Sequence, residues 1–347
     1  MNISTEPSII SLANSLELYT GDPVVSIREY CREKLKTIVN KVDRVLSMDH
    51  LEELVCDDLN LKVHRVWSDL ELQRLSDSYV EKGELVFLAL SQQLSSDVYG
   101  IFIKLTNPCS DSGAPWVSVI DCRGDKEHKR HWTFWHEVAH CLMAVKEMQL
   151  PLRRSLWNPK KIQKEPIEVL TDYLAKDLAF YAPIFDPLLN KELANNRGEL
   201  SFSVVNTVRR KFTQEASFLS TLITCVERYD KPCLLVEAKM GFSKKEQQEN
   251  DIETGTHNPS LRIVNSIPND FMRNLSLFLP KNYRVPLSSV ICEAKIGTPT
   301  VDCVENFQNW SDSRGHSLRP MEILVSAKKA GDSVYAIIRP TKDTHPT

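Results

Sequence analysis

The sequence predicts an α+β fold, with helices and strands in separate stretches of the chain. Three observations support this prediction: a helical pattern near the N-terminus, several short strand patterns ahead of one apolar helix, and further strand patterns towards the C-terminus. The length of 347 residues is enough for two domains and a small additional piece. We expect an N-terminal segment and helix at 1–47, a second domain at 48–229 and a mostly β domain at 230–347.

The N-terminal part is predicted to contain two helices followed by strands. Residues 1–22 are polar, and we expect them to be weakly structured. An apolar stripe with helical spacing then predicts a helix over 24–47, and a shorter helix is expected over 49–59. Apolar or alternating stretches predict strands at 61–67, 84–90, 98–105 and 116–120.

The next helix carries the motif His136-Glu137-Val138-Ala139-His140. Four residues turn an α-helix through about 400°, so His136 and His140 would project from one face and hold a single ion. Glu137 would stand beside that ion, where a general base can take a proton from a zinc-bound water. The flanking residues are mostly apolar, which suits a buried helix. The alternative interpretation is a pair of core histidines four residues apart.

A third metal ligand is expected from the segment that follows. The stretch 168–183 has helical apolar spacing, and Glu168 and Asp172 share one helix face as an i,i+4 pair. One of them would bind the metal while the other orients a ligand histidine. Glu165 is a rival for the metal, because it begins the same acidic segment. Glu168 also has an alternative role, as a carboxylate that complements the dipole at a helix N-terminus.

Two other stretches near the predicted site carry reactive or charged side chains. Cys109 lies in a loop between two predicted strands, where its thiolate would fill the fourth position on zinc as a cysteine switch. The alternative is a loop cysteine without a role. The run 152–164 would contact a phosphate backbone or an acidic substrate, or would simply form a solvated surface. The basic residues singled out in this run are Arg153, Arg154, Lys160 and Lys161.

The overall composition excludes some classes of protein but does not identify a partner. The hydrophobic content of 42%, the charged content of 26% and the net charge of −3 describe an ordinary globular chain. Nine cysteines without CxxC pairs predict neither a zinc ribbon nor a disulfide framework. The N-terminus has no secretion pattern and no stretch is apolar enough to span a membrane, so we expect a cytoplasmic location and no membrane partner.

Two motifs in the chain resemble those of ImmA/IrrE-type metallopeptidases. In that family a basic residue and Phe-Thr precede HExxH, and residues 129–134 read Lys-Arg-His-Trp-Thr-Phe. The second family motif, Glu-x-x-Ala-Asp/Asn-x-Phe-Ala, is similar to residues 168–175, with Thr171 and Leu174 replacing Ala and Phe. The resemblance extends from about residue 51 to residue 229.

This resemblance implies a zincin-like peptidase domain and a catalytic mechanism. One Zn²⁺ per chain would be held by His136, His140 and Glu168, with Asp172 orienting a ligand. Zinc would lower the pKa of its water towards about 7, and Glu137 would act as base and then as proton shuttle. The same ligand set also suits Mn²⁺ or Fe²⁺. Family substrates are helix-turn-helix transcriptional repressors that are cut once in a regulatory step.

The C-terminal part is predicted to be mostly β. Strands are expected at 231–240, 288–294, 321–328 and 332–339, the last two joined as a hairpin, and the polar stretch 241–258 is expected to be a flexible loop. Behind a peptidase of this type, such a domain resembles the GAF-like sensor of the IrrE group. A ligand pocket would involve Trp310, Tyr283, Arg284 and His316, although isolated aromatic residues more often belong to the core.

The same two-domain layout resembles the CapP peptidases encoded beside CBASS anti-phage systems. That resemblance implies a CapH-like repressor as the substrate and a DNA-damage signal such as single-stranded DNA as the activator. The alternative function is a non-catalytic sensor or binding protein with a structural zinc site. A structural site would be closed by four protein ligands and would not need Glu137, so the intact motif favours the enzyme.

Overall fold

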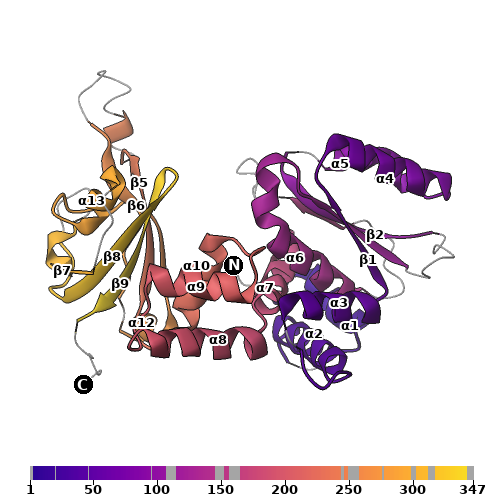
Figure 1. Cartoon of the computed structure of the whole chain (residues 1–347), viewed down its shortest axis with the longest axis horizontal. Coiled ribbons are helices and arrows are strands. Elements are labelled where there is room, and N and C mark those ends of the chain that lie inside the picture. Colours follow the sequence, from indigo (N-terminus) through magenta and orange to yellow (C-terminus); the bar gives the residue numbers. More distant parts are fainter. Residues whose placement is uncertain are drawn as a thin grey trace. The chain divides into compact units, whose positions relative to one another are not determined.

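The computed structural model describes residues 3–19, 21–45, 47–94, 96–106, 115–144, 165–243, 246–248, 258–275, 277–297, 302–311 and 317–341, and the backbone of 152–155. The fold is mixed α+β, as expected, and the chain divides into two compact units (Figure 1). The first unit comprises Met1–Leu188 and Arg209–Ser217, and the second comprises Leu189–Val208 and Phe218–Thr347. This division is coarser than the three segments expected from the sequence, and it places the N-terminal helices in the first unit.

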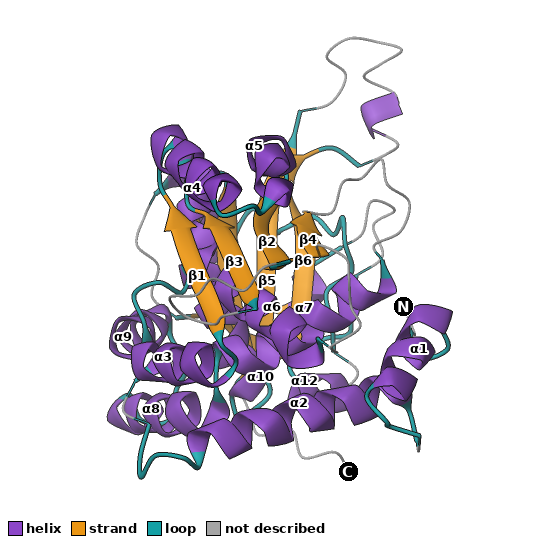
Figure 2. Ribbon diagram, turned by 90° about the vertical axis from the view of Figure 1, so that its right-hand side faces the viewer, coloured by secondary structure: helices purple, strands orange, loops and turns teal. Residues whose placement is uncertain are grey.

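The first unit is built on a four-stranded sheet with the order β1-β3-β2-β4 (Figure 2). Its strands are β1 (Leu61–Val66), β2 (Val98–Lys104), β3 (Trp116–Asp121) and β4 (Leu152–Ser155). β1 runs parallel to β3, whereas β2 is antiparallel to both β3 and β4. The register between β2 and β4 shifts between Val98 and Gly100, which marks a β-bulge.

Helices cover both faces of this sheet. One face packs against α4 (Asp69–Glu81), η1 (Leu85–Ala89) and α5 (Leu90–Gln93) through an apolar cluster that includes Ile101 and Val119. The other face packs against α6 (Arg130–Met143), which follows η2 (Gly124–Lys129) and also contacts α7 (Pro166–Ala179). The buried helix α6 is therefore placed between a sheet and a second helix.

Three N-terminal helices complete this side of the first unit. They are α1 (Pro7–Ser15), α2 (Pro23–Val39) and α3 (Met48–Asp58). The expectation of weak structure at 1–22 is wrong for residues 7–15, because α1 buries Ile9 and Leu12. α2 begins where the Asp22 side chain accepts hydrogen bonds from two backbone N–H groups, as expected for an N-cap. It ends at Val39, earlier than expected, and Val42 and Val45 beyond it are only half-buried.

The strands expected at 61–67, 98–105 and 116–120 are confirmed, but 84–90 is helical. In η1 and α5, Phe87 and Leu90 are buried and three residues apart, while Leu85 and Leu88 are exposed. A spacing of three residues between buried positions is typical of a 3₁₀-helix rather than of a strand. It is not recognisable in the sequence, because the exposed residues beside them are also apolar. The helix expected over 168–183 ends at Ala179 instead, and α8 (Ala182–Asn195) begins after a short break.

The second unit is built on a five-stranded antiparallel sheet with the order β6-β5-β9-β8-β7. Its strands are β5 (Leu234–Gly241), β6 (Ser260–Pro268), β7 (Cys303–Asn306), β8 (Glu322–Ala330) and β9 (Ser333–Pro340). Of the helices α9 (Phe202–Phe212) and α10 (Phe218–Arg228), α10 contacts β5 and β6. The expected β8–β9 hairpin is confirmed, with Gly331 at φ +59° in its turn.

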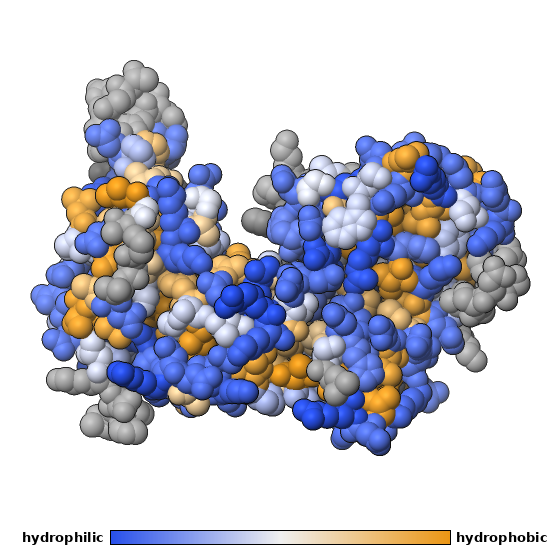
Figure 3. All heavy atoms as spheres, viewed as in Figure 1, coloured by the Kyte–Doolittle hydropathy of each residue, from blue (hydrophilic) through white to orange (hydrophobic). Residues whose placement is uncertain are grey.

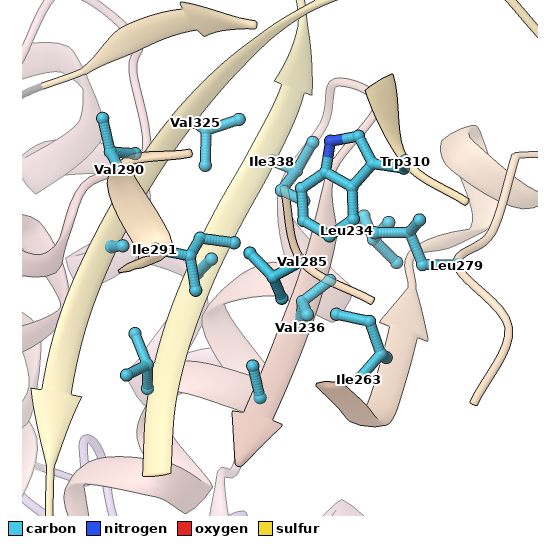
Figure 4. Packing of buried hydrophobic residues seen from close by; sticks show 14 of the residues in the cluster. Leu234, Val236, Ile263, Leu279, Val285, Val290, Ile291, Trp310, Val325 and Ile338 are labelled. Atoms are coloured by element: carbon cyan, nitrogen blue, oxygen red, sulfur yellow. The ribbon is translucent and has the colours of Figure 1, made fainter. Parts of the chain in front are cut away.

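The core of the second unit lies on one face of this sheet, beneath α12 (Asp270–Asn274), α13 (Val290–Ile296) and η3 (Phe307–Asn309). Figure 4 shows Trp310 beside Leu234 and Ile338, with Ile291 and Val285 further along the sheet. The strand expected at 288–294 is wrong. Ser289 caps α13 at its N-terminus and Gly297, at φ +101°, ends it, which are helix signals within an apolar stretch.

The outer surface combines hydrophilic areas with separate hydrophobic patches (Figure 3). In the first unit, the most exposed large apolar residues include Leu70, Leu85 and Leu88 on α4 and η1. Among the described residues, no helix is both long enough and apolar enough to span a membrane.

Candidate metal centre

The HExxH motif lies on α6, and all five of its residues are buried. His136 and Glu137 are fully buried, and His140 is 1% exposed. The imidazole rings of His136 and His140 are 4.8 Å apart between centroids and point to the same side of the helix. One face of α6 therefore offers two imidazoles, as the i,i+4 spacing predicted.

Glu168, at the start of α7, lies between the two histidines. Its Oε2 is 3.2 Å from Nε2 of His136, and its Oε1 is 3.3 Å from Nε2 of His140. Donor atoms about 2.05 Å from a zinc ion, at tetrahedral angles, are about 3.3 Å from one another. The two separations from Glu168 match this value, and the ligand atoms of the three residues all lie within 4.8 Å of one another. Glu165 is an exposed residue that precedes α7, so Glu168 is the better third ligand of the two rivals.

Two residues in the next turn of α7 contact the Nδ1 atoms of the two candidate ligand histidines. Oδ1 of Asp172 lies 3.1 Å from Nδ1 of His136. The Thr171 hydroxyl donates to the backbone oxygen of Ile167 at 2.8 Å and lies 3.5 Å from Nδ1 of His140, from which it can accept a hydrogen bond. Each imidazole is thus approached by an acceptor at Nδ1, an arrangement that leaves Nε2 for a metal. The ligand and both orienting residues are spaced i, i+3 and i+4 on one helix.

The protonation states of the ligands also suit metal binding. Burial opposes ionisation of Glu168, but the neighbouring imidazoles of His136 and His140 outweigh it and hold the pKa of this carboxyl below its ordinary value. Burial lowers the pKa of His140, despite the opposing effect of Glu168. An ionised carboxylate and a neutral imidazole are the forms that bind zinc. The three side chains fit the ion in donor type, separation and charge.

Glu137 points to the sheet rather than to α7. Its carboxylate lies against β2 at Gly100, directly after the β-bulge. Phe102, two residues further along β2 and on the same face, has its ring 6.3 Å from the ring of His140. Residues of β2 therefore pack against the motif on α6.

A second group of metal-ligating side chains lies behind α6. It consists of Glu52, His131 and Glu215. Arg65 is 2.7 Å from Glu52 and 3.7 Å from Glu215, and Arg130 is 3.2 Å from Glu215. Both carboxylates are already paired with these guanidinium groups, so we interpret the group as an ion-pair cluster rather than a cation site.

His131 is a neutral member of this cluster. Its Nε2 donates to the backbone oxygen of Ala179 at 2.7 Å, and Nδ1 is 3.9 Å from Glu52. Burial lowers the pKa of His131 to about 4. His131 therefore ties the first turn of α6 to the end of α7 without carrying charge.

Several residues predicted from the sequence cannot be compared with this site, because the structure does not describe their side chains. Cys109, Lys160, Lys161 and His316 lie outside the described residues, and so does most of the predicted loop 241–258. Arg153 and Arg154 lie on β4, of which only the backbone is described, paired with β2. Cys141, which is adjacent to the motif, is buried in the core.

The second unit contains one pocket near a residue expected to bind a ligand. Arg284 lines a cavity of about 370 Å³ together with apolar residues that include Leu261 and Val285. The guanidinium of Arg284 is held 2.7 Å from Glu246, which is also paired with the buried Arg262. Trp310 is fully buried in the core, so the core interpretation is correct for this residue.

Sequence reasoning missed three features that surround the metal centre: Gly100, the orienting role of Thr171 and the cluster behind α6. A glycine inside the apolar strand Val-Tyr-Gly-Ile-Phe-Ile-Lys is a signal for a close backbone approach and would have indicated the first of these. No family model matches the chain, and no curated protein matches it in sequence.

Proposed function

We propose that the protein is a zinc metallopeptidase whose catalytic residues are those of the HExxH helix. The observation that carries this proposal is the separation of 3.2–3.3 Å between Glu168 and the Nε2 atoms of His136 and His140. Such a set of three donors, with a glutamate following the first histidine, leaves one coordination position for water or substrate. The resemblance to ImmA/IrrE-type peptidases, which have a zincin-like fold, agrees with this assignment.

Zinc, when bound, would act as a Lewis acid towards the scissile carbonyl and the attacking water. His136, His140 and Glu168 would hold the ion, and Asp172 and Thr171 would keep the imidazoles in place. Glu137 would accept the proton of the attacking water on its carboxylate and then deliver it to the leaving amine. The enclosed position of Glu137 limits the solvent molecules that compete for that proton.

The proposed substrate is a helix-turn-helix repressor similar to CapH, cut in a regulatory step that derepresses a stress or anti-phage operon. We further propose that the second unit is a GAF-like sensor and that single-stranded DNA is its signal. A five-stranded antiparallel sheet with helices against it is compatible with that architecture. The cavity beside Arg284 offers a cationic group next to apolar surface for a ligand.

The test is incubation of the purified, zinc-loaded protein with a CapH-like helix-turn-helix repressor, with and without single-stranded DNA. The matched variant is Glu137→Gln, which preserves side-chain size and the three metal donors. We expect a single cut that requires DNA and Glu137, with one zinc retained per chain in the variant. A cut without DNA would support the peptidase but not its activator, and retained cleavage by Glu137→Gln would refute the mechanism. A bound zinc without any cleavage would favour a structural zinc site in a binding protein.

A further inference from the structure

Gly100 occupies the point of closest approach between the sheet of the first unit and the motif-bearing face of α6. A β-carbon added to Gly100 would lie 2.6 Å from Oε1 and 3.2 Å from Cδ of Glu137. It would also lie 2.7 Å from Cγ2 of Thr133, one turn earlier on the same helix face. Contacts this short are incompatible with ordinary van der Waals packing, so no side chain fits here unless α6 or the glutamate moves.

The backbone conformation of Gly100 does not account for the glycine. Its φ is not among the positive values found at Gly83, Gly124 and other turn glycines, so a residue with a β-carbon would be tolerated by the backbone alone. A side chain is excluded because Glu137 and Thr133 occupy the space that a β-carbon would need.

The β-bulge supplies a second, independent observation. The pairing of β2 with β4 shifts between Val98 and Gly100, directly opposite Glu137. Bulges bend a strand locally and redirect its side chains, and they are frequent beside active sites. Here the bulge brings the bare backbone of Gly100 towards α6 at the level of the glutamate.

We propose that Gly100 is a positioning residue for Glu137. The missing side chain lets the carboxylate lie against the β2 backbone, and this contact fixes how far Glu137 stands from the ion held by His136, His140 and Glu168. A larger residue at position 100 would push the carboxylate out of place while leaving the three metal donors untouched, because His136 and His140 contact Glu168 on α7. This inference rests on the proposed peptidase function for its catalytic consequence, but the steric relation itself does not.

The catalytic test uses Gly100→Ala together with Thr133→Ser. The second change removes Cγ2 of Thr133, keeps its hydroxyl and leaves Glu137 as the remaining obstacle to the new methyl group. We expect the double variant to fold, to bind one zinc with unchanged affinity, and to lose kcat about 100-fold at unchanged KM. Thr133→Ser alone and Gly241→Ala should behave as wild type, since a β-carbon at Gly241 meets nothing within 4 Å. Wild-type kcat in the double variant would overturn the proposal.

A second measurement does not depend on activity. We would measure the Tm of the chelator-treated, zinc-free protein with and without Gly100→Ala. The comparison is made in two backgrounds: Thr133→Ser alone, and Thr133→Ser combined with Glu137→Ala. Because Glu137 is fully buried, its carboxylate moves only by displacing its neighbours, and we expect Gly100→Ala to lower Tm by about 5 °C when Glu137 is present. The loss should largely disappear in the Glu137→Ala background. Equal losses in both backgrounds would overturn the steric relation, whereas a wild-type protein that cuts nothing would overturn only the proposed function.

Discussion

Oδ1 of Asp172 lies 3.1 Å from Nδ1 of His136, on the opposite side of the ring from the contact between Nε2 and Glu168. A metal-ligating histidine commonly donates its other ring N–H to a carboxylate, which fixes the tautomer and raises the basicity of the ligand. Both carboxylates come from α7, so a single helix supplies one of the proposed metal ligands and the group that would orient another.

Asp172→Asn is therefore expected to weaken zinc binding by about 10- to 100-fold, because the amide cannot stabilise the imidazole as a carboxylate does. Zinc affinity is measured by competition with a metal indicator. The matched control is Asp177→Asn on the same helix, since Asp177 pairs with Arg28 and Arg32 away from the site. Equal affinities for the wild type and Asp172→Asn would contradict the orienting role.

Thr171→Val is expected to weaken zinc binding less, by a few-fold up to about 10-fold. Valine has nearly the same shape but no hydroxyl, so Nδ1 of His140 would lose the acceptor that lies 3.5 Å away. Thr171→Ser keeps the hydroxyl and should retain wild-type affinity in the same competition assay. If the valine and serine variants bind zinc equally well, the hydroxyl has no role in holding His140.

Glu168→Gln is expected to reduce the zinc content of the purified protein well below one ion per chain. The amide is a neutral and weaker donor for zinc than a carboxylate. Glu165→Gln is the control, because Glu165 lies only three residues earlier but is exposed. Elemental analysis after dialysis distinguishes the two. Loss of zinc in Glu165→Gln, with full occupancy in Glu168→Gln, would reverse the assignment of the third ligand.

The ion-pair cluster behind α6 is expected to make stability depend on pH. Burial raises the pKa of Glu52 to about 7, although Arg65 opposes this shift. The unfolded chain has the lower pKa, so the folded state binds more protons between about pH 4.5 and 7, and this contribution to stability falls as pH rises through that range. The loss amounts to about 3 kcal/mol.

Chemical denaturation of wild type and Glu52→Gln at about pH 5.5 and about pH 8 measures this effect. Wild type should lose more stability than the variant between the two values, because glutamine does not titrate. A parallel pH dependence in both proteins would show that Glu52 is already ionised at the lower pH.

Short-range periodicity was enough to predict those parts of the site that lie within one helix. His136, Glu137 and His140 were placed on one helix, and Glu168 and Asp172 on one face of another, because an α-helix returns to the same side after four residues. The β8–β9 hairpin was predicted for a similar reason, since a glycine turn joins two strand patterns. Local rules failed where two patterns overlapped: α13 lies in an apolar stretch that also suits a strand, and its helix caps are the better signal.

Contacts between side chains of different elements were settled by the three-dimensional packing alone. The choice of Glu168 over Glu165 depends on how α7 packs against α6, and the contact between Gly100 and Glu137 depends on a bulge in a strand distant from α6 in the sequence. The cluster of Glu52, His131 and Glu215 joins three separate segments of the chain. Such contacts depend on how whole helices and sheets pack together, so they cannot be predicted from the periodicity of a single segment.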